Sequence, residues 1–215
     1  MASEKKRISF DICLPDGARH RALVLPGLTV GQLTQEVLAE FSGDTRYLDR
    51  HEEQRYSLWL PGDDYPLPPD RAIQALGPLT TLELREKALP IPAGATPLTV
   101  ALYLRHRSHV FPIVWQPAII GRPEPNSPRN GLLAVNLQPY SFAVSRQQAE
   151  LLMVDGRAAV RRLSGNTTSL NGQLLPFNEE LPETTPAVSL AADDLLSLDR
   201  SGITLQCIMP GAGVS

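Results

Sequence analysis

The chain has 215 residues, of which 42% are hydrophobic and 20% charged, the composition of an ordinary globular protein with room for two modest domains. Its formal net charge of −3 excludes a global positive field that would recruit nucleic acid or anionic lipid. No apolar run is as long as a membrane span, and the polar N-terminal segment lacks the apolar core of a secretory signal. We therefore expect a cytoplasmic protein without membrane insertion, with Cys13 and Cys207 as reduced core residues.

The first 88 residues follow the pattern of a small α+β domain. Alternating apolar and polar residues predict strands at 7–14 and 19–25, which the turn residues 15–17 join into a hairpin. Thr29 is a favourable N-cap, and Gln32 three residues later completes a capping box. The helix that follows is expected to bury a face formed by Val30, Leu33, Val37, Leu38 and Phe41. The series is completed by a strand at 56–60, a helical turn at 73–76 and a strand at 80–85.

This order of hairpin, helix, strand and strand, with the pattern Leu-Thr-Val-x-x-Leu at residues 28–33, resembles the ubiquitin-like β-grasp fold. Among members of that fold, the chain is most similar to bacterial ubiquitin-like proteins associated with type VII secretion. Conjugating ubiquitins end the last strand in a flexible Gly-Gly tail, whereas residues 84–88 here continue into further chain. The resemblance therefore implies that residues 1–88 form a docking domain for a further protein partner and not a covalent tag.

Residues 89–97 are predicted to separate two domains. The segment holds Pro90, Pro92 and Pro97, and proline-rich stretches of this kind favour an extended, semi-stiff spacer. After it the chain has arginines but no lysine, and the planar fork of arginine suits bidentate binding of an oxyanion. We expect a second domain at 98–209 and a flexible tail at 210–215.

The second domain is expected to contain many short strands and no helix, as in an all-β sandwich. Strands at 98–104 and 110–115 form a predicted hairpin. Its tip contains His106 and His109, but no carboxylate or cysteine accompanies them, so an exposed loop is favoured over a metal site. The remaining strands are expected at 118–122, 132–137, 149–154, 158–160, 189–198 and 203–208.

Polar residues gather on both sides of the predicted hairpin at 149–160. Asp155-Gly156 favours a tight turn in its middle, so the polar clusters at 145–146 and 164–168 should meet at one end of the sheet. Arg122, which ends the upstream strand, could join them there. Arginine forks, serine hydroxyls and asparagine amides that converge on loops form the donor-rich surface that a phosphate or carboxylate site requires.

Three motifs in this half resemble the forkhead-associated (FHA) domain, a β-sandwich that recognises phosphothreonine. The family pattern of Gly-Arg, Ser-Arg-x-His-Ala and Leu-Ser-x-Asn-Gly-Thr-x-x-Asn-Gly is matched in order by residues 121–122, 145–149 and 163–172. The resemblance implies phosphopeptide-binding roles for Arg122, Ser145, Arg146 and Asn166. It implies loop-shaping roles for Gly121, Gln148, Ser164, Thr168, Asn171 and Gly172. By residue type alone, a solvated surface arginine, a turn-stabilising serine and an Asx-turn asparagine remain the alternatives.

The chain departs from the family pattern at two positions. Gln148 replaces the histidine that braces the binding loops, and Thr167 replaces a glycine, which would strain the loop if that residue needed a positive φ. The resemblance implies a non-catalytic adaptor without a cofactor, bound to a phosphothreonine-containing protein such as a serine/threonine kinase or its substrate. The alternative is a degenerate FHA domain that binds proteins without phosphate, within a secretion or signalling complex. An enzyme is disfavoured because Ser145 has no sequence-evident base and no glycine-rich loop precedes a helix.

Overall fold

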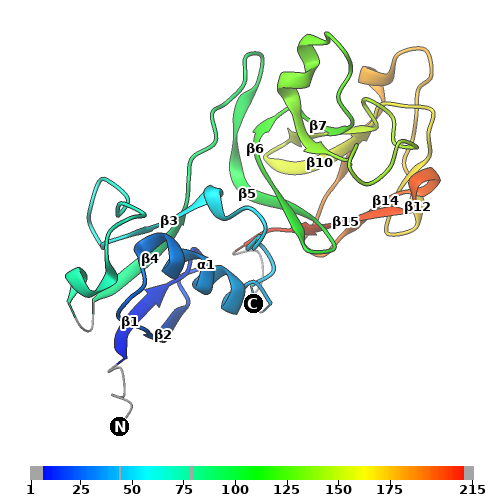
Figure 1. Cartoon of the computed structure of the whole chain (residues 1–215). Helices are drawn as coiled ribbons and strands as arrows, with labels where there is room; N and C mark the ends of the chain where they lie inside the picture. The colour runs from blue at the N-terminus through cyan, green and yellow to red at the C-terminus, as the bar shows by residue number, and fades with distance from the viewer. Residues whose placement is uncertain (1–6, 44, 78–79, 211–215) are drawn as a thin grey trace. The chain divides into compact units, whose positions relative to one another are not determined.

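The computed structural model describes residues 7–43, 45–77 and 80–210. The chain divides into two compact units, Met1–Ala88 and Leu89–Ser215 (Figure 1). In the described part of the chain, no helix is long and apolar enough to span a membrane. Of the expected tail at 210–215, only Pro210 lies within the described residues.

The first unit is a mixed four-stranded sheet with one α-helix, and its elements follow the predicted order. The sheet order is β2-β1-β4-β3, in which the central pair β1 and β4 is parallel and the outer pairs are antiparallel. The strands and short 3-10 turns are β1 (Ile8–Cys13), β2 (Arg19–Val24), η1 (Glu53–Arg55), β3 (Tyr56–Trp59), η2 (Ile73–Leu76) and β4 (Thr81–Glu86).

Helix α1 (Val30–Phe41) begins at the predicted capping box. The Thr29 hydroxyl accepts a hydrogen bond from the Gln32 backbone N–H at 3.3 Å, and the Gln32 side chain accepts one from the Thr29 N–H at 2.9 Å. The expected core face is buried except at Phe41, which lies at the helix end and stacks on the His20 ring instead. The core that this face and the sheet share includes Phe10, Ile12, Leu33, Leu38, Leu58, Leu82 and Leu84.

The second unit is built from two β-sheets, and its described residues contain no α-helix, so the all-β prediction for this half is confirmed. The five-stranded sheet has the order β13-β10-β9-β7-β8, and the six-stranded sheet has the order β12-β11-β14-β15-β5-β6. The strands are β5 (Thr96–His106), β6 (His109–Gln116), β7 (Ala118–Gly121), β8 (Leu133–Asn136), β9 (Ala149–Val154), β10 (Arg157–Arg162), β11 (Thr168–Leu170), β12 (Gln173–Leu174), β13 (Val188–Ser189), β14 (Leu195–Leu198) and β15 (Ile203–Ile208). Short 3-10 turns occur at η3 (Pro128–Leu132), η4 (Pro182–Thr184) and η5 (Asp199–Ser201).

One hydrophobic core lies between the two sheets of this unit. One sheet contributes Ile120, Leu151 and Val160, and the other contributes residues such as Leu104 and Leu205. Alternate residues of each strand point into the core, so their neighbours point outward, which is the arrangement of a β-sandwich. The loops at the sheet ends are therefore left free to carry polar groups.

Cys207 lies in β15 and is 1% exposed, as expected for a core residue, whereas Cys13 is only half-buried. Burial first, and then the nearby carboxylates of Asp194 and Asp193, together raise the pKa of the Cys207 thiol to about 12. This thiol is therefore protonated and unreactive at neutral pH.

The hairpin of β9 and β10 has the predicted turn. Asp155 has φ 50° and Gly156 has φ 75°, the left-handed pair that a two-residue hairpin turn of this type requires. The register pairs Arg157 with Val154 beside the turn and Arg162 with Ala149 at the far end. The polar segments that flank the hairpin are thereby brought next to each other.

The hairpin of β5 and β6 is longer than predicted, and the expected exposed loop at 105–109 is wrong. The strands pair up to His106 and His109, which leaves Arg107 and Ser108 as the turn. The His106 ring is buried because β15 pairs alongside β5, and its Nδ1 lies 2.9 Å from the Thr204 carbonyl oxygen. Among the described residues, no group of three or more His, Cys, Asp or Glu side chains could hold a metal ion.

The strand predicted at 189–198 is also wrong, because it is two strands in different sheets. Strand β13 pairs with β10, whereas β14 pairs with β15 and β11. Between them Asp193 adopts φ 70°, and the Asp194 carboxylate accepts a hydrogen bond from the Ala191 N–H at 2.7 Å. The turn that carries the chain from one sheet to the other therefore lies at Asp193 and Asp194, between two apolar stretches that were predicted as one strand.

Candidate anion-binding site

Three loop segments that are far apart in the sequence meet at one end of the five-stranded sheet, where β7 ends, β9 begins and β10 ends. In this sheet β9 lies between β7 and β10. The Arg122 N–H donates to the carbonyl oxygens of Ser145 and Arg146, at 3.3 and 3.2 Å. The Gln148 N–H donates to the Ile120 carbonyl oxygen at 2.9 Å. The end of β7 and the start of β9 are thus joined by backbone hydrogen bonds.

Gly121 is required at this junction for space. A Cβ atom at this position would lie 2.8 Å from the Ser145 carbonyl oxygen and still closer to the carbonyl of Arg146. Real side chains do not tolerate such contacts with backbone, and Gly121 does not have a positive φ. The loop-shaping role expected for this glycine therefore lies in the close approach of two backbone segments.

Gln148 links its own segment to the loop that carries Asn166 through a buried side-chain amide, and the residue is 1% exposed. Its Oε1 accepts a hydrogen bond from the Ser145 N–H at 3.0 Å. Its Nε2 donates to the Asn166 carbonyl oxygen and to the Thr168 hydroxyl, both at 2.9 Å. With both of its N–H groups and its carbonyl oxygen engaged, the amide braces the loops at the position where the family pattern has histidine.

The Asn166 side chain lies between Ser145 and a more distant arginine. Its Nδ2 donates to the Ser145 hydroxyl at 2.8 Å and to the Ala143 carbonyl oxygen at 3.2 Å. Its Oδ1 accepts from Arg200 Nη1 at 3.3 Å. Thr167 is not among the residues with positive φ, so replacing the family's glycine here does not force the backbone strain that we considered.

Arg162 holds the loop that carries Asn166. Its guanidinium is buried and donates to the carbonyl oxygens of Ser164, Gly165 and Leu175 at 2.8, 2.7 and 3.4 Å. It also lies over the Phe177 ring, with its Cζ 4.7 Å from the ring centroid. Ser164 shapes this loop through its carbonyl, because its buried hydroxyl has no hydrogen-bond partner in the described structure.

The arginines at the site differ in their charge partners. Arg146 forms an ion pair with Glu124, with Nη1 and Oε1 3.0 Å apart. Arg122 donates from Nε to the Val144 carbonyl oxygen at 2.8 Å. Its two Nη atoms have no hydrogen-bond partner among the described residues and are not buried. Arg122 therefore keeps two cationic donors available, and its backbone N–H contacts the carbonyl oxygen of Ser145.

Asn171 and Gly172 lie at the opposite end of β11 from Asn166. Both have positive φ, 51° and 79°, and they form the turn between β11 and β12. The Asn171 side chain donates to Asp194 Oδ1 at 2.7 Å and accepts from the Leu195 N–H at 2.9 Å. The structure thus gathers the four predicted contact residues and places this pair in a separate turn.

Sequence reasoning did not single out Arg162 or Arg200 as parts of the site. Arg162 occupies an inward-facing position of β10, and this break in an apolar alternation was the available signal. Arg200 reaches Asn166 from η5 across a sequence separation that no motif spans.

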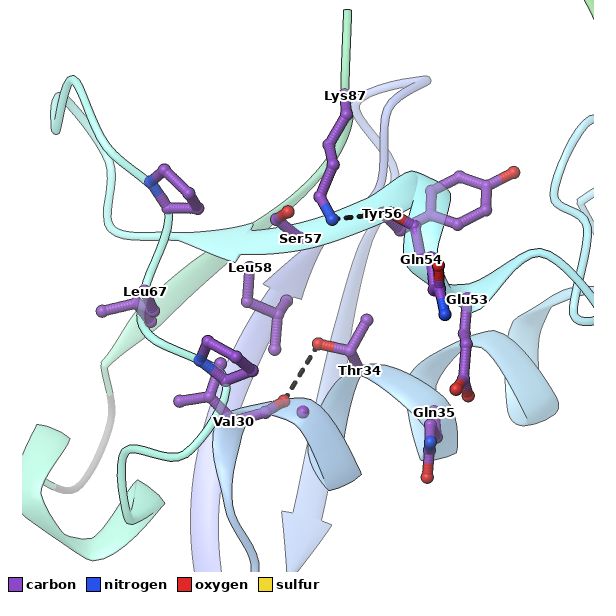
Figure 2. Close-up of a pocket in the computed structure, with 13 residues that line it drawn as sticks. Val30, Thr34, Gln35, Glu53, Gln54, Tyr56, Ser57, Leu58, Leu67 and Lys87 are labelled. Atoms are coloured by element: carbon purple, nitrogen blue, oxygen red, sulfur yellow. Dashed lines mark hydrogen bonds between the residues drawn. The ribbon is translucent and has the colours of Figure 1, made fainter.

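The first unit has a separate groove of about 400 Å³ between α1, β3 and the segment 66–69 (Figure 2). Figure 2 shows Lys87 reaching across β3, where its Nζ donates to the Gln54 carbonyl oxygen at 2.6 Å. The lining combines the apolar Val30 and Leu58 with polar groups such as Glu53. Its walls come from separate stretches of the chain, and no sequence pattern pointed to it.

No family model and no curated protein matches this chain. Similar solved structures include an FHA domain from an analysis of phosphothreonine-dependent interactions, with TM-score 0.38, 19% identity, and 51% of this chain and 96% of that chain covered. Another is the kinase-interacting FHA domain of kinase associated protein phosphatase from Arabidopsis, with TM-score 0.41, 15% identity and 54% and 98% covered. A designed protein based on human erythrocytic ubiquitin has TM-score 0.29, 25% identity and 39% and 95% covered.

Proposed function

We propose that the second unit is an FHA-type module in a non-catalytic adaptor, and that it binds a threonine-phosphorylated protein such as a serine/threonine kinase or its substrate. One observation carries the proposal. The three motif segments converge, so that the Arg122 backbone N–H donates to the Ser145 carbonyl oxygen, the Arg122 Nε donates to the Val144 carbonyl oxygen, and the Ser145 hydroxyl accepts from Asn166. The Gln148 side chain holds Ser145 and Asn166 in this arrangement through buried hydrogen bonds.

The donors in this cluster suit a phosphate group. A phosphothreonine carries a charge of about −1.5 to −2 at neutral pH and three strong acceptor oxygens. Arg122 can donate two N–H groups to it. The Ser145 oxygen accepts from Asn166, so its own proton is free to be donated to the phosphate. Arg146 is engaged with Glu124 and is assigned a peripheral role.

The network also supports a binding function over a catalytic one. The hydrogen-bond partner of the Ser145 hydroxyl is the amide of Asn166, which donates to it and cannot accept its proton. An activated serine needs an adjacent base. We therefore expect no turnover of bound ligand at this site.

The first unit is proposed to dock onto a further protein partner. The N–H of Lys87 donates to the Arg55 carbonyl oxygen at 2.8 Å, so the chain after β4 stays bound to the unit before it continues into Leu89. A free, flexible C-terminal tail of the conjugating kind does not fit this arrangement. Isolation of the chain joined to another protein by an isopeptide bond near Ala88 would overturn the docking proposal.

The test of the phosphate proposal is calorimetric titration with phosphothreonine peptides selected from a library, each compared with its unphosphorylated twin. Charge-assisted hydrogen bonds contribute about 1.5–3 kcal/mol each, so Arg122→Ala should weaken phosphopeptide binding about tenfold to a hundredfold. Ser145→Ala should have a smaller effect in the same direction. Arg157→Ala is the matched control, because Arg157 is exposed at the turn end of the β9–β10 hairpin.

The alternative, a degenerate FHA domain that binds without phosphate, is decided by the same titration. Equal affinity of the unmutated protein for phosphorylated and plain peptides would contradict the proposal. The intact Gln148 brace and the absence of strain at Thr167 favour the phosphate-dependent function.

A further inference from the structure

Besides the buried Arg162, whose guanidinium is held by loop carbonyl oxygens, two arginines at the site have no acidic partner among the described residues. Arg129 pairs with Glu183 and Arg146 pairs with Glu124. In contrast, neither Arg122 nor Arg200 forms an ion pair with any described carboxylate. Arg122 is assigned to the phosphate in the proposed function, which leaves Arg200 as a second cation without a counter-charge.

Arg200 is linked to the proposed phosphate position through one side chain. Asn166 donates from Nδ2 to the Ser145 hydroxyl at 2.8 Å, and its Oδ1 accepts from Arg200 Nη1 at 3.3 Å. Ser145 and Arg200 therefore contact opposite ends of the same amide. A ligand phosphate held at Ser145 would lie within a side chain's reach of Arg200.

The turn that carries Arg200 is anchored to the same loop. The Asp199 N–H donates to the Thr167 carbonyl oxygen at 3.3 Å, and the Asp199 carboxylate accepts from the Ser169 hydroxyl at 3.0 Å. The backbone at Arg200 is thus held in place, while its side chain is exposed to solvent. An exposed guanidinium can bind a carboxylate without a large desolvation cost.

The single bond from Arg200 to Asn166 is long and joins a cation to a neutral oxygen. A carboxylate offers Arg200 a shorter, charge-assisted and bidentate alternative. If Arg200 turned to such a group, Asn166 Oδ1 would be released to accept a backbone N–H of the bound peptide. Recognition of an acidic residue would then strengthen the grip of Asn166 on the ligand.

We propose that Arg200 is a second recognition point of the site and selects partners in which an aspartate or glutamate lies close to the phosphothreonine. This inference rests on the proposed function, because the phosphothreonine fixes the ligand beside Arg200. It assigns to Arg200 the sequence preference of the module, and to Arg122 and Ser145 its phosphate dependence.

The experiment compares phosphothreonine peptides that carry aspartate or asparagine at each position near the phosphothreonine, titrated against the full chain and against Arg200→Gln. Glutamine can still donate to Asn166 but carries no charge. The unmutated protein should prefer aspartate at one position about threefold to fivefold, as expected for an exposed charge pair, and the preference should fall in high salt. Arg200→Gln should abolish the preference, whereas Arg157→Gln should preserve it.

The results of these titrations distinguish selection of an acidic residue by Arg200 from the other roles that Arg200 could have. Absence of an aspartate preference at every position, or its survival in Arg200→Gln, would overturn the inference. Equal weakening of aspartate and asparagine peptides would assign Arg200 to positioning Asn166 and would also overturn it. If a phosphoserine at that position raised affinity and aspartate did not, the partner would be doubly phosphorylated and the acidic-residue claim would fall. Failure of the proposed function itself would appear separately, as equal binding of phosphorylated and unphosphorylated peptides.

Discussion

The buried amide of Gln148 connects Ser145 with Asn166 and Thr168, which belong to two segments far apart in the sequence. A histidine ring has two nitrogens, whereas this amide has two N–H groups and one carbonyl oxygen and uses all of them. The glutamine is therefore a physically complete brace in its own right. Because this amide is buried, its removal would leave the polar groups that it now bonds without a partner and shielded from water.

We predict that Gln148→Ala lowers the free energy of unfolding of the second unit. Each buried polar group left without a partner costs about 1–3 kcal/mol, so the combined loss should be about 3 kcal/mol or more. Phosphopeptide binding should fall as well, because the loops lose their common anchor. Chemical denaturation measures the first effect and titration the second.

Gln147→Ala is the matched control for that substitution. Among the described residues, the side chain of Gln147 bonds only to Arg129, at an exposed site, so its loss should change stability by no more than about 0.5 kcal/mol. If the two substitutions were equally mild, Gln148 would not be a brace.

At the scale of elements, α1 and the β9–β10 hairpin are positioned by local chemistry. The capping box fixes where the helix begins, and the paired positive φ values of Asp155 and Gly156 fix the hairpin register. That register in turn decides which residues meet at the site, because a shift by one residue would send each side chain to the other face.

We predict that Thr29→Ala destabilises the first unit by about 1 kcal/mol, within a usual range of about 0.5–2 kcal/mol for lost N-caps. The alanine leaves the Gln32 N–H without its side-chain acceptor. Thermal unfolding followed by helical circular dichroism measures the change, and Thr29→Ser should retain most of the stability. An alanine variant that melts with the unmutated protein would show that the cap contributes nothing.

At the scale of the whole molecule, each unit has its own sheets and its own core. The expected linker of 89–97 remains a prediction, but β5 begins at Thr96, so its last two residues belong to a strand. A fragment of the second unit should accordingly begin at Leu89 and not at residue 98.

We predict that fragments 1–88 and 89–215 each unfold in a single cooperative transition. Neither core needs residues of the other unit among the groups described. Differential scanning calorimetry of each fragment should give matching calorimetric and van't Hoff enthalpies. A fragment that is molten or aggregated when isolated would contradict the division.

Several parts of this protein follow from the sequence alone. The helix start at Thr29, the tight turn at Asp155-Gly156 and the order of the strands rest on interactions between residues close in the chain. Local φ preferences, caps and periodicity report such interactions directly. The same local patterns identified the segments around Arg122, Ser145 and Asn166 that come together at the site.

Other features were decided only by the tertiary structure. His106 is buried because β15 pairs beside it, Arg162 is buried because loop carbonyls surround its guanidinium, and Arg200 reaches Asn166 from a distant turn. The split of the strand predicted at 189–198 likewise depends on which sheet each half can pair with. Each of these outcomes depends on partners far away in the chain. Local propensities and residue spacing do not reveal which residues those partners are. The environment of a side chain is fixed only once the sheets have formed around it.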